Sequence, residues 1–428
     1  MTVAPDTVIR GGRLIDGTGE RRADILVADG RIVAVGEGLD AERVVDAGGC
    51  LVSPGLVDLH THLRQPGREE AETIETGARA AALGGYTAVL AMPNTTPPID
   101  CASVVREVLE LGRAAVCDVH TTGAITVGRA GEQLSPMAEM AALGVRIFTD
   151  DGTGVQDDRL MRRALEYASG LDVTLAQHCE VTSLSEGTCM HEGEWSTRLG
   201  LPGQPSEAEE LMVMRDIALA RLTGAKVHFQ HMSTAGSVAM IAAAKAGGLV
   251  VTADAAPHHF TLTDASCAGY DATFKVHPPL RTDADVAAIA AGLASGVLDA
   301  IATDHAPHTP EDKERPFDHA PPGMLGLEYA LALAFTQLVD GGSGMSEADV
   351  LGAMSWRPAR IAGLDHHGGP IVEGAPANLC VIDPAARWTI DDSGGASRSR
   401  NVPYVGREVR GRVRHTFLFG EQVVIDGE

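Results

Sequence analysis

Two histidines separated by one residue close a short apolar run in the sequence LVDLHTH, which begins at residue 56. In a β-strand, residues i and i+2 point to the same face, so His60 and His62 can reach one ion. Other apolar runs end in further residues that can bind metal, namely the pair Asp150 and Asp151, then His178, His231 and Asp304. Imidazole and carboxylate ligands without thiolate are typical of a catalytic zinc ion, or of a similar divalent ion, with an open coordination position. The joint pattern therefore predicts a metal centre.

Each of these residues also has an ordinary explanation when it is taken alone. A histidine at the end of a strand is more often hydrogen-bonded than metal-bound, and an aspartate there is often a helix N-cap. Spacing does not exclude four other imidazoles as ligands, those of His120, His258, His259 and His305. Asp150 and Asp151 face opposite sides of an extended chain, and pleating alone does not choose between them.

The residues between 55 and 365 alternate short apolar runs with amphipathic helical stretches. Eight such runs begin at residues 56, 87, 119, 146, 173, 226, 251 and 300. Strand followed by helix, eight times over roughly 250 residues or more, is the length and rhythm of a (β/α)8 TIM barrel in the α/β class. In that fold the carboxyl ends of the strands meet at one mouth, where the metal-competent side chains would come together. A doubly wound open sheet is the alternative, but no phosphate-binding glycine loop follows the first strand.

The two ends of the chain have a different pattern, of short alternating strands joined by tight turns. The N-terminal part includes ADILVADGRIVAVG, in which Asp-Gly between two apolar runs predicts a β-hairpin. The C-terminal part, with GREVRGRVRHTFLFG and EQVVIDG, has the same style after a Gly- and Pro-rich break. Neither end has enough strands to bury a face alone, so we expect residues 1–54 and 366–428 to pair into one small sheet domain.

The composition narrows the class of protein. The chain has 428 residues with 34 Lys plus Arg against 58 Asp plus Glu, and this net charge of −24 argues against nucleic-acid or anionic-lipid partners. It has no run of 18 apolar residues and no secretory signal at its start, so we expect a cytoplasmic protein with no membrane partner. Its seven cysteines include no CxxC pair, which fits reduced thiols. Only four residues are lysines, and the first of them is Lys226.

Several motifs carry a family resemblance: GLVDLHTHLRQPG, AMPNTTP, FTDDGTGVQD, QHCE, QHMS and ATDHAPH. Over essentially the whole chain the sequence resembles the dihydroorotases of the amidohydrolase superfamily, specifically the longer bacterial type called class I. The resemblance implies a metal-dependent barrel over residues 55–365 and a β-sandwich made from residues 1–54 and 366–428. It assigns metal ligation to His60, His62, Asp151, His178, His231 and Asp304.

The bridge between the metals is also implied by the resemblance. Many amidohydrolases hold two metals with a carboxylated lysine on the fourth strand, but this chain has no lysine before Lys226. Class I dihydroorotases have a bridging aspartate in the FTDDG motif, which corresponds to Asp151 here, and the resemblance implies two zinc ions per subunit. The choice of Asp151 over Asp150 rests on this resemblance.

Contacts with a substrate carboxylate and ring follow from the same resemblance. Arg64, two residues beyond His62, stays on the metal face and can bind a carboxylate with two parallel hydrogen bonds. The other contacts that the resemblance implies come from Asn94, His308, Pro322 and Gly323. Where the family usually has Asn, this chain has His277, whose imidazole can donate one hydrogen bond but cannot mimic a whole amide.

The activity implied by the resemblance is reversible hydrolysis of dihydroorotate to N-carbamoyl-aspartate in pyrimidine biosynthesis. Water activated by metal attacks the ring amide, and Asp304 takes its proton and passes it to the departing nitrogen. Two alternatives are another cyclic amidase, a hydantoinase or allantoinase, and an inactive homologue that serves as a partner of aspartate transcarbamoylase. Relatives of the first kind keep the bridging lysine, and those of the second kind lose metal ligands, whereas here all six ligand positions are filled.

The partners of the protein and the role of one polar stretch both stay open at this point. A homodimer and a complex of the active enzyme with aspartate transcarbamoylase are both compatible with the resemblance. The polar stretch 309–322 after the eighth run is long for a βα loop, and it has two interpretations, a solvated charge run or a mobile lid over the mouth.

Overall fold

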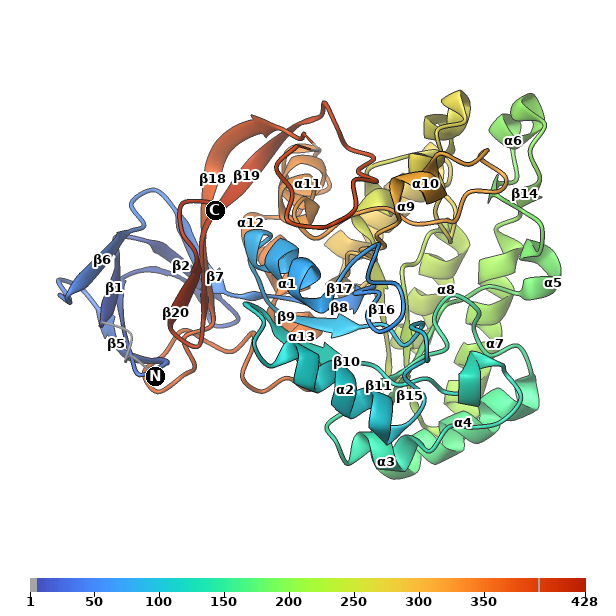
Figure 1. Cartoon of the computed structure of the whole chain (residues 1–428), viewed down its shortest axis with the longest axis horizontal. Coiled ribbons are helices and arrows are strands. Elements are labelled where there is room, and N and C mark those ends of the chain that lie inside the picture. Colours follow the sequence, from blue (N-terminus) through green and yellow to red (C-terminus); the bar gives the residue numbers. More distant parts are fainter. Residues whose placement is uncertain (1–5, 392) are drawn as a thin grey trace.

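The computed structural model describes residues 6–391 and 393–428, and it is an α/β protein in which parallel strands alternate with helices (Figure 1). Within these ranges, one parallel strand lies in each of the eight apolar runs of the sequence. These strands are β8 (Leu56–Thr61), β9 (Tyr86–Ala91), β10 (Asp118–Thr121), β11 (Ile147–Phe148), β12 (Thr174–Gln177), β15 (Lys226–Phe229), β16 (Val251–Ala255) and β17 (Ala300–Ile301).

The eight strands pair in the order in which they follow along the chain. One set of pairings runs from β8 through β9 to β10, and another runs from β11 through β12, β15 and β16 to β17. Parallel bridges from Gly123 to Phe148 and from Thr61 to His305 join the two sets at both edges. The order therefore returns to β8, and we call these eight strands the strand ring. The carboxyl ends of all its strands face the same side, because every pairing is parallel.

Helices follow the strands of the ring and cover its outer side (Figure 1). They are α1 (Ile74–Leu83), α2 (Ala102–Gly112), α3 (Met137–Ala141), α4 (Asp158–Leu171), α7 (Glu207–Thr223), α8 (Ala235–Ala246), α9 (Asp283–Ala294), α11 (Ala330–Ala334) and α12 (Glu347–Met354). A further helix, α13 (Trp356–Ala362), packs its Ala362 against the side chains inside the ring. Thr234 caps α8 directly after the QHMS motif, because its side chain accepts a hydrogen bond from the Ser237 amide.

Shorter elements lie in the connections at the carboxyl side of the ring. The excursion between β12 and α7 contains α5 (Thr182–Ser185), β13 (Met190–His191), α6 (Glu194–Leu199) and β14 (Gly203–Gln204). The connection after β17 contains α10 (Pro310–Lys313). Short 3-10 turns occur at Val127–Arg129, Pro257–Phe260, Asp264–Gly269 and Ala272–Phe274, and a π-helical segment at Phe335–Asp340 continues α11.

Strands from both ends of the described chain lie side by side at the left of Figure 1. One sheet pairs β20, β19, β18, β7, β2 and β3, in that order, and the other pairs β5, β4, β1 and β6. Leu379 in β18 is opposite Pro54 in β7, so sequence-distant segments share one ladder. The N-terminal strands are β1 (Thr7–Arg10), β2 (Arg13–Asp16), β3 (Gly19–Arg22), β4 (Asp24–Ala28), β5 (Arg31–Gly36), β6 (Arg43–Asp46) and β7 (Leu51–Pro54). The C-terminal strands are β18 (Leu379–Thr389), β19 (Glu408–Leu418) and β20 (Glu421–Val424).

The hairpin predicted at Asp29 and Gly30 is confirmed. Antiparallel pairing joins β4 to β5, with Ala28 opposite Arg31. Both turn residues have positive φ, 48° at Asp29 and 77° at Gly30. A two-residue hairpin turn of this hand needs positive φ at both positions, which is why Asp-Gly is favoured there.

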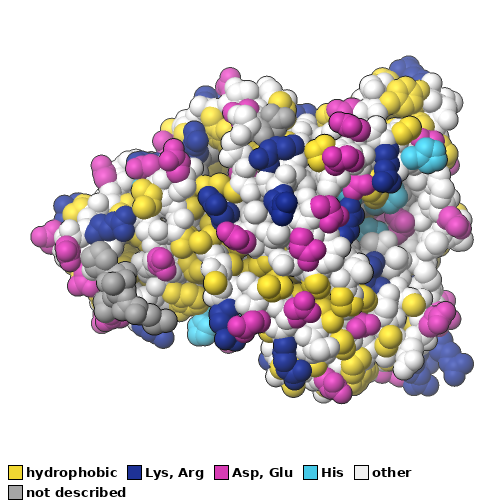
Figure 2. Space-filling model, viewed as in Figure 1, with side chains coloured by type: hydrophobic (Ala, Val, Ile, Leu, Met, Phe, Trp, Pro, Cys, Tyr) yellow, Lys and Arg dark blue, Asp and Glu magenta, His cyan; other side chains and the backbone are white. Residues whose placement is uncertain are grey.

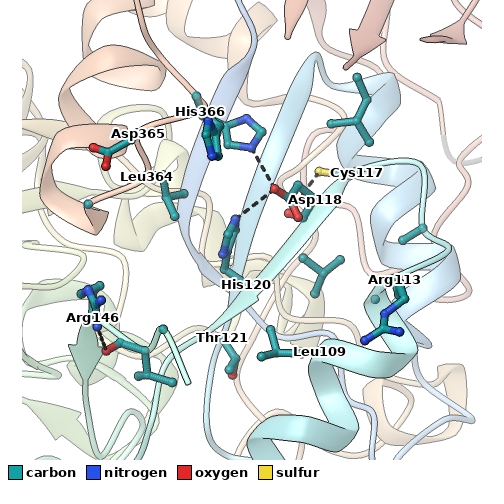
Figure 3. Close-up of a pocket in the computed structure, with 18 of the residues that line it drawn as sticks. Leu109, Arg113, Cys117, Asp118, His120, Thr121, Arg146, Leu364, Asp365 and His366 are labelled. Atoms are coloured by element: carbon teal, nitrogen blue, oxygen red, sulfur yellow. Dashed lines mark hydrogen bonds and ion pairs between the residues drawn. The ribbon is translucent and has the colours of Figure 1, made fainter. Parts of the chain in front are cut away.

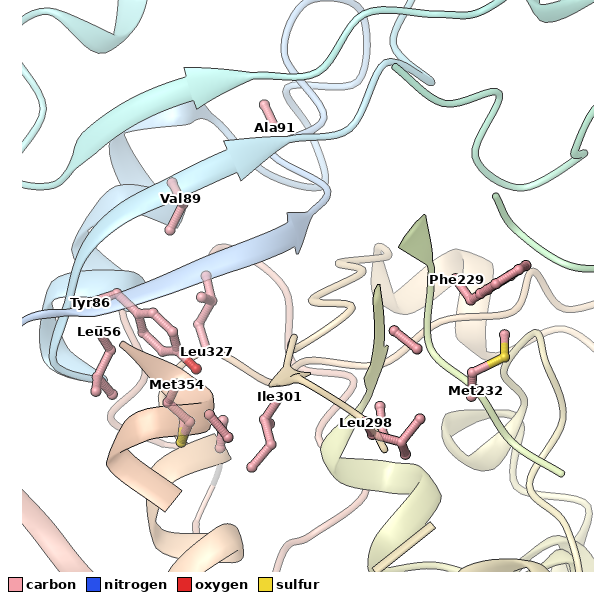
Figure 4. Close-up of a cluster of buried hydrophobic side chains, with 14 of the residues drawn as sticks. Leu56, Tyr86, Val89, Ala91, Phe229, Met232, Leu298, Ile301, Leu327 and Met354 are labelled. Carbon is pink, nitrogen blue, oxygen red and sulfur yellow. The ribbon is translucent and has the colours of Figure 1, made fainter. Parts of the chain in front are cut away.

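The apolar core lies mainly between the strand ring and its helices. Figure 4 shows part of this buried cluster, with Tyr86, Phe229, Ile301 and Leu327 among its members. A smaller cluster fills the ring with side chains from five strands, Leu59, Leu90, Ile147, Ala176 and Ala300. The interior of the ring is therefore packed, and a reaction site needs the polar side chains at its carboxyl end.

The surface drawn in Figure 2 carries acidic and basic side chains interspersed with one another, so the negative charge on this face is not gathered in one patch. Among the helices of the described ranges, none is both long enough and apolar enough to cross a bilayer.

A buried carboxylate holds the first and last strands of the ring in register near their carboxyl ends. Asp58 Oδ1 accepts hydrogen bonds from the amides of Thr303, at 2.9 Å, and His60, at 3.2 Å, and its Oδ2 accepts the Thr303 hydroxyl. Burial raises the pKa of Asp58 to about 7, although these hydrogen bonds lower it. Asp58 thereby fixes the positions of His60 and of the residue that follows Thr303, Asp304.

We expect Thr303→Val to lower the free energy of unfolding by ~1–3 kcal/mol, because it keeps the shape but leaves a buried carboxylate oxygen without its donor. Urea unfolding of the variant and the wild type measures this difference. Thr197→Val is the matched control, since the Thr197 side chain is exposed. Equal stability of wild type and Thr303→Val would contradict the role given to Asp58.

Candidate metal centre

The six predicted metal ligands come together at the carboxyl side of the strand ring. His60 lies in β8 and His62 just after it, and the other four follow β11, β12, β15 and β17. All six side chains are buried, those of His60, His62, Asp151, His178, His231 and Asp304. Residues that are up to 244 positions apart in the sequence, from 60 to 304, thus share one site because the ring closes.

The Asp151 carboxylate lies between the imidazoles. Its Oδ1 is 3.3 Å from His60 Nε2, 3.6 Å from His178 Nδ1 and 3.8 Å from His231 Nε2. Its Oδ2 is 3.7 Å from His62 Nε2. Two groups with metal-binding geometry share this carboxylate, one with the first pair of histidines and one with the second. Asp151 therefore has the position of a ligand that could bridge two ions.

Asp304 approaches the same two nitrogens as Asp151, the Nε2 atoms of His60 and His62. Its Oδ1 is 3.1 Å from His62 Nε2 and 3.4 Å from His60 Nε2. Its Oδ2 points toward His258 Nε2, 3.9 Å away. Burial raises the pKa of Asp304, but the imidazoles of His62 and His60 outweigh it and hold the pKa well below its usual range. The carboxylate is therefore ionised at neutral pH and can accept a proton from a group that becomes acidic.

The structure separates the two adjacent aspartates that pleating left open. Asp150 turns away from the imidazoles and accepts hydrogen bonds from the amides of Ile125, at 2.9 Å, and Thr126, at 3.0 Å, and from the Thr126 hydroxyl. Asp151 turns toward the imidazoles. Asp150 is thus satisfied by the backbone of a neighbouring loop, and its adjacent residue is available for a cation.

The donor set fits a divalent cation. His60 Nε2 and Asp151 Oδ1 face each other, yet both are buried without a hydrogen-bond partner among the described residues. Burial lowers the pKa of His60, but Asp151 and Asp304 raise it to about 9, so the carboxylates attract positive charge here. A cation between these atoms would satisfy both of them, and nitrogen and oxygen donors suit zinc and similar ions.

The four competing imidazoles have different surroundings. His258 Nε2 lies 3.9 Å from Asp304 Oδ2, at the edge of the centre. His259 Nε2 is instead 3.1 Å from the carbonyl oxygen of Pro278. His305 Nε2 faces Glu72 at 3.4 Å, and His120 pairs with Asp118 on β10, outside the centre.

Three residues of the site have a left-handed backbone conformation that non-glycine residues rarely adopt. The φ angles are 59° at Arg64, 38° at His231 and 48° at Asp304. Such conformations cost of order 1–3 kcal/mol each and persist where the surrounding structure holds them. The side chains of all three residues line the same small cavity.

A cavity of about 160 Å³ opens beside the metal centre. It is lined by all the predicted substrate contacts, Arg64, Asn94, His277, His308, Pro322 and Gly323. Arg64 is held by the Pro307 carbonyl, 3.0 Å from its Nε, and it lies 3.3 Å from His308 Nε2. Burial lowers the pKa of Arg64 to about 10, so the guanidinium stays charged at neutral pH. The cavity therefore has a partly buried cation next to the cluster.

Asn94 has a more specific position than the resemblance implied. Its Oδ1 is 2.9 Å from His62 Nδ1, and its Nδ2 donates to Asp151 Oδ2 at 3.1 Å. The amide thus orients two candidate ligands as well as lining the cavity. A partner of this kind fixes the imidazole tautomer and the carboxylate position for metal binding.

The structure adds residues that sequence reasoning missed. Gln230 Nε2 is 3.2 Å from His60 Nδ1, and Asp254 accepts the His231 amide at 2.6 Å. Glu180 lies 3.7 Å from His178 Nε2 and 4.0 Å from His277 Nδ1. Gln230 and Glu180 belong to the QHMS and QHCE motifs, which could have revealed them, whereas Asp254 has no comparable signal in its strand.

The segment 309–322 is partly packed and partly charged. Lys313 Nζ donates to the carbonyl oxygens of Ala272 and Pro321, both at 2.9 Å, and Asp312 pairs with Arg68 at 2.6 Å. Phe317 is buried. The end of the segment reaches the cavity wall at Pro322.

A buried histidine and aspartate cluster at the carboxyl ends of parallel strands is an arrangement suited to metal-assisted hydrolysis. A family model described as "Dihydro-orotase-like" matches residues 49–237. The dihydroorotase of Streptomyces coelicolor is 48% identical, with 99% of each chain covered, and that of Mycobacterium tuberculosis is 48% identical, with 98% and 99% covered.

Solved structures of two cyclic amidases have the same fold. A dihydropyrimidinase from Brevibacillus agri has a TM-score of 0.86 at 25% identity, covering 99% of this chain and 96% of that one. An L-hydantoinase from Arthrobacter aurescens has a TM-score of 0.89 at 24% identity, covering 99% and 97%. The protein is a cyclic amidohydrolase with a site for metal. Within that class, the chain belongs to the dihydroorotase family.

We expect Asp151→Asn to weaken metal binding by more than ~100-fold, since even an outer partner of a ligand is worth ~10–100-fold. Metal per chain after dialysis against buffered metal measures this effect. The neighbouring Asp150→Asn is the matched control. It should keep its metal while losing ~1–3 kcal/mol of stability, because an amide nitrogen cannot accept the hydrogen bonds at that site. Full metal content in Asp151→Asn would contradict the position given to this carboxylate.

Proposed function

We propose that this protein catalyses the reversible hydrolysis of the cyclic amide of dihydroorotate to N-carbamoyl-aspartate. The observation that carries the proposal is the partly buried, charged Arg64 in the cavity wall beside the histidine and aspartate cluster. A guanidinium there can bind the carboxylate that dihydroorotate has and simpler cyclic amides lack. The names of the relatives from S. coelicolor and M. tuberculosis support the same substrate.

The proposed architecture follows from the sheet order. We propose that the strand ring and its helices, residues 55–365, form a (β/α)8 barrel. The described residues of the ranges 1–54 and 366–428 would form the β-sandwich, with the two terminal sheets as its layers. Residues 1–5 and 392 of these ranges lie outside the described part of the chain. The ladder between β7 and β18 supports this division, because it ties the two ends together outside the ring.

The proposed cofactor is a pair of zinc ions. His60, His62 and Asp304 would hold one ion, His178 and His231 the other, and Asp151 would bridge them. Bound ions of this kind supply Lewis-acid chemistry, which polarises the amide carbonyl and activates water at neutral pH. Lys226, the first lysine of the chain, is exposed at the start of β15 and pairs with Asp172, so it offers no bridge.

The side chains of this protein would perform the remaining tasks. Arg64 would bind the substrate carboxylate and orient the ring, with His308 beside it. Asp304 would accept the proton of the attacking water at its carboxylate and deliver it to the departing ring nitrogen. The first of these steps needs the ionised carboxylate, which is the form that the neighbouring imidazoles of His62 and His60 favour. Pro322 and Gly323 would contact the ring through their backbone, and His277 would offer one hydrogen bond.

Another cyclic amidase, a hydantoinase or allantoinase, remains the competing function, since solved structures of hydantoinases have the same fold. The carboxylate-binding set favours dihydroorotate. A catalytically inactive scaffold is disfavoured, because each of the six proposed ligand positions carries a residue able to bind metal.

We expect Arg64→Met to lower kcat/KM for dihydroorotate by ~10–100-fold, the value of a lost hydrogen-bonded charge contact. Hydrolysis of dihydrouracil, which lacks the carboxylate, should change much less. Steady-state kinetics with both substrates separate the two candidate functions. Arg68→Met is the matched control, since Arg68 pairs with Asp312 instead of lining the cavity. An equal loss on both substrates, or no turnover of dihydroorotate by the wild type, would contradict the proposal.

We expect Asp304→Asn to lower kcat by at least ~100-fold while most of the metal is retained, because an amide cannot carry the proton. Turnover and metal content are measured on the same sample. Asp299→Asn is the control, since Asp299 lies just before β17 and pairs with Lys245. Turnover near that of the wild type in Asp304→Asn would remove this residue from the mechanism.

The setting of the protein completes the proposal. We propose a cytoplasmic location, supported by seven cysteines that are all free. We retain a homodimer and an association with aspartate transcarbamoylase as hypotheses. Size-exclusion chromatography of this protein alone tests the homodimer through its apparent mass. Chromatography of this protein mixed with aspartate transcarbamoylase tests the association, and independent elution would count against a stable complex.

A further inference from the structure

A second histidine and aspartate cluster lies away from the proposed catalytic centre, at the other side of the strand ring. We propose that Asp118, His120 and His367 bind a divalent transition-metal ion of the zinc type. One ligand atom from each residue lies within 4.8 Å of the others. The cavity beside this cluster and the cavity beside the catalytic centre have no lining residue in common.

The backbone brings the three side chains together from two distant parts of the chain. Asp118 begins β10, and His120, two residues later, shares its face of the strand. Val119 between them points the other way, toward Gly112 at the end of α2. His367 comes from the segment between α13 and β18, and it lies beside Asp118 of β10.

The distances are compact enough for coordination. Asp118 Oδ2 is 3.2 Å from His120 Nε2 and 3.0 Å from His367 Nε2. Figure 3 shows Asp118 with dashed lines to His120 and to a second imidazole beside His366. Ligand atoms around a tetrahedral zinc ion, with bonds of ~2.0–2.1 Å, lie only slightly farther apart than this. Small side-chain rotations would therefore convert the hydrogen-bonded triad into a metal site.

His367 is oriented by a partner on its other nitrogen. Its Nδ1 is 3.0 Å from the Thr87 hydroxyl, and its side chain is almost fully buried. A hydrogen bond at one ring nitrogen that leaves the other free for a ligand is the usual support of a metal-binding histidine. The imidazole is thus held in place before any ion arrives.

The local charge also suits a cation. The Asp118 carboxylate lies between the two imidazoles, with its Oδ2 within hydrogen-bond distance of both, and it is an acidic oxygen donor of the kind that a divalent ion binds. Two cationic residues line the same cavity, but both have other partners. Arg113 pairs with Glu110, and Arg146 donates to the carbonyl oxygens of Ala141 and Val145.

An entry path and a free coordination position are present. The cluster borders a cavity of about 620 Å³. The solvent-exposed fraction is 34% for the Asp118 side chain and 33% for the His120 side chain, so an ion can reach them from solvent. Three protein ligands leave the fourth position of a tetrahedral site for water or a small anion in this cavity.

The bound ion would connect β10 of the ring to the segment that leads into β18, 249 residues away along the chain. It would therefore stabilise the junction between the ring and the terminal sheets, independently of catalysis. Any ion that binds only the folded chain shifts unfolding to higher temperature.

The test measures zinc content per chain by inductively coupled plasma mass spectrometry. It compares the wild type, His120→Asn and His366→Asn after dialysis at the same buffered free zinc concentration. His366 is the matched control, because it is exposed and lines the cavity but is not one of the three ligands. We expect the wild type and His366→Asn to hold one zinc more than His120→Asn. The zinc-dependent rise in melting temperature should be smaller in His120→Asn, and turnover at saturating zinc should be unchanged.

Equal zinc content in the wild type and His120→Asn at every free zinc concentration would overturn the proposal and leave a purely hydrogen-bonded triad. Zinc-edge anomalous diffraction gives an independent measurement, with a peak expected between Asp118, His120 and His367. Absence of that peak in zinc-soaked crystals whose catalytic site is filled would also overturn it. Because both readouts are metal contents, they hold whether or not the protein turns over dihydroorotate.

Discussion

The buried carboxylate of Asp151 is the feature on which the rest of the site depends. Four imidazoles surround it within 3.8 Å, and burial by itself would favour the neutral acid. The imidazoles instead hold its pKa well below the usual range, so the site contains a buried negative charge. A buried charge is stable only when it is paired, and cations between the carboxylate and the imidazoles are the pairing that this donor set fits.

Apolar packing inside the strand ring stabilises the fold despite this concentration of buried polar groups. Aliphatic side chains such as Leu59 and Ala176 fill the ring, and the polar residues are confined to the carboxyl ends of the strands. There the ligands are supported in turn: Asp58 anchors the end of β8, Gln230 reaches His60, and Asn94 reaches His62. The positions of the proposed ligands therefore depend on a set of neutral and charged partners beneath them.

Much of this arrangement was accessible from the sequence, because it depends on local patterns. Periodicity located the strands of the ring, and the i, i+2 spacing of His60 and His62 placed two imidazoles on one face. The choice between Asp150 and Asp151 was not accessible from pleating, since it depends on a loop amide at Ile125 that only the folded chain brings near. Asp254 was missed for a related reason, because an aspartate inside an apolar run has no partner in the local sequence.

The same limit explains why the cluster at the other side of the ring was not predicted. Asp118 and His367 are 249 residues apart, and no motif links them. One titration tests most directly whether turnover depends on metal at the Asp151 centre: metal is removed, then restored stepwise, with dihydroorotate turnover and bound metal measured on each sample. We expect turnover to be absent without metal and to rise as the Asp151 centre fills. Metal at full content with no turnover of dihydroorotate, or turnover that persists without metal, would contradict it.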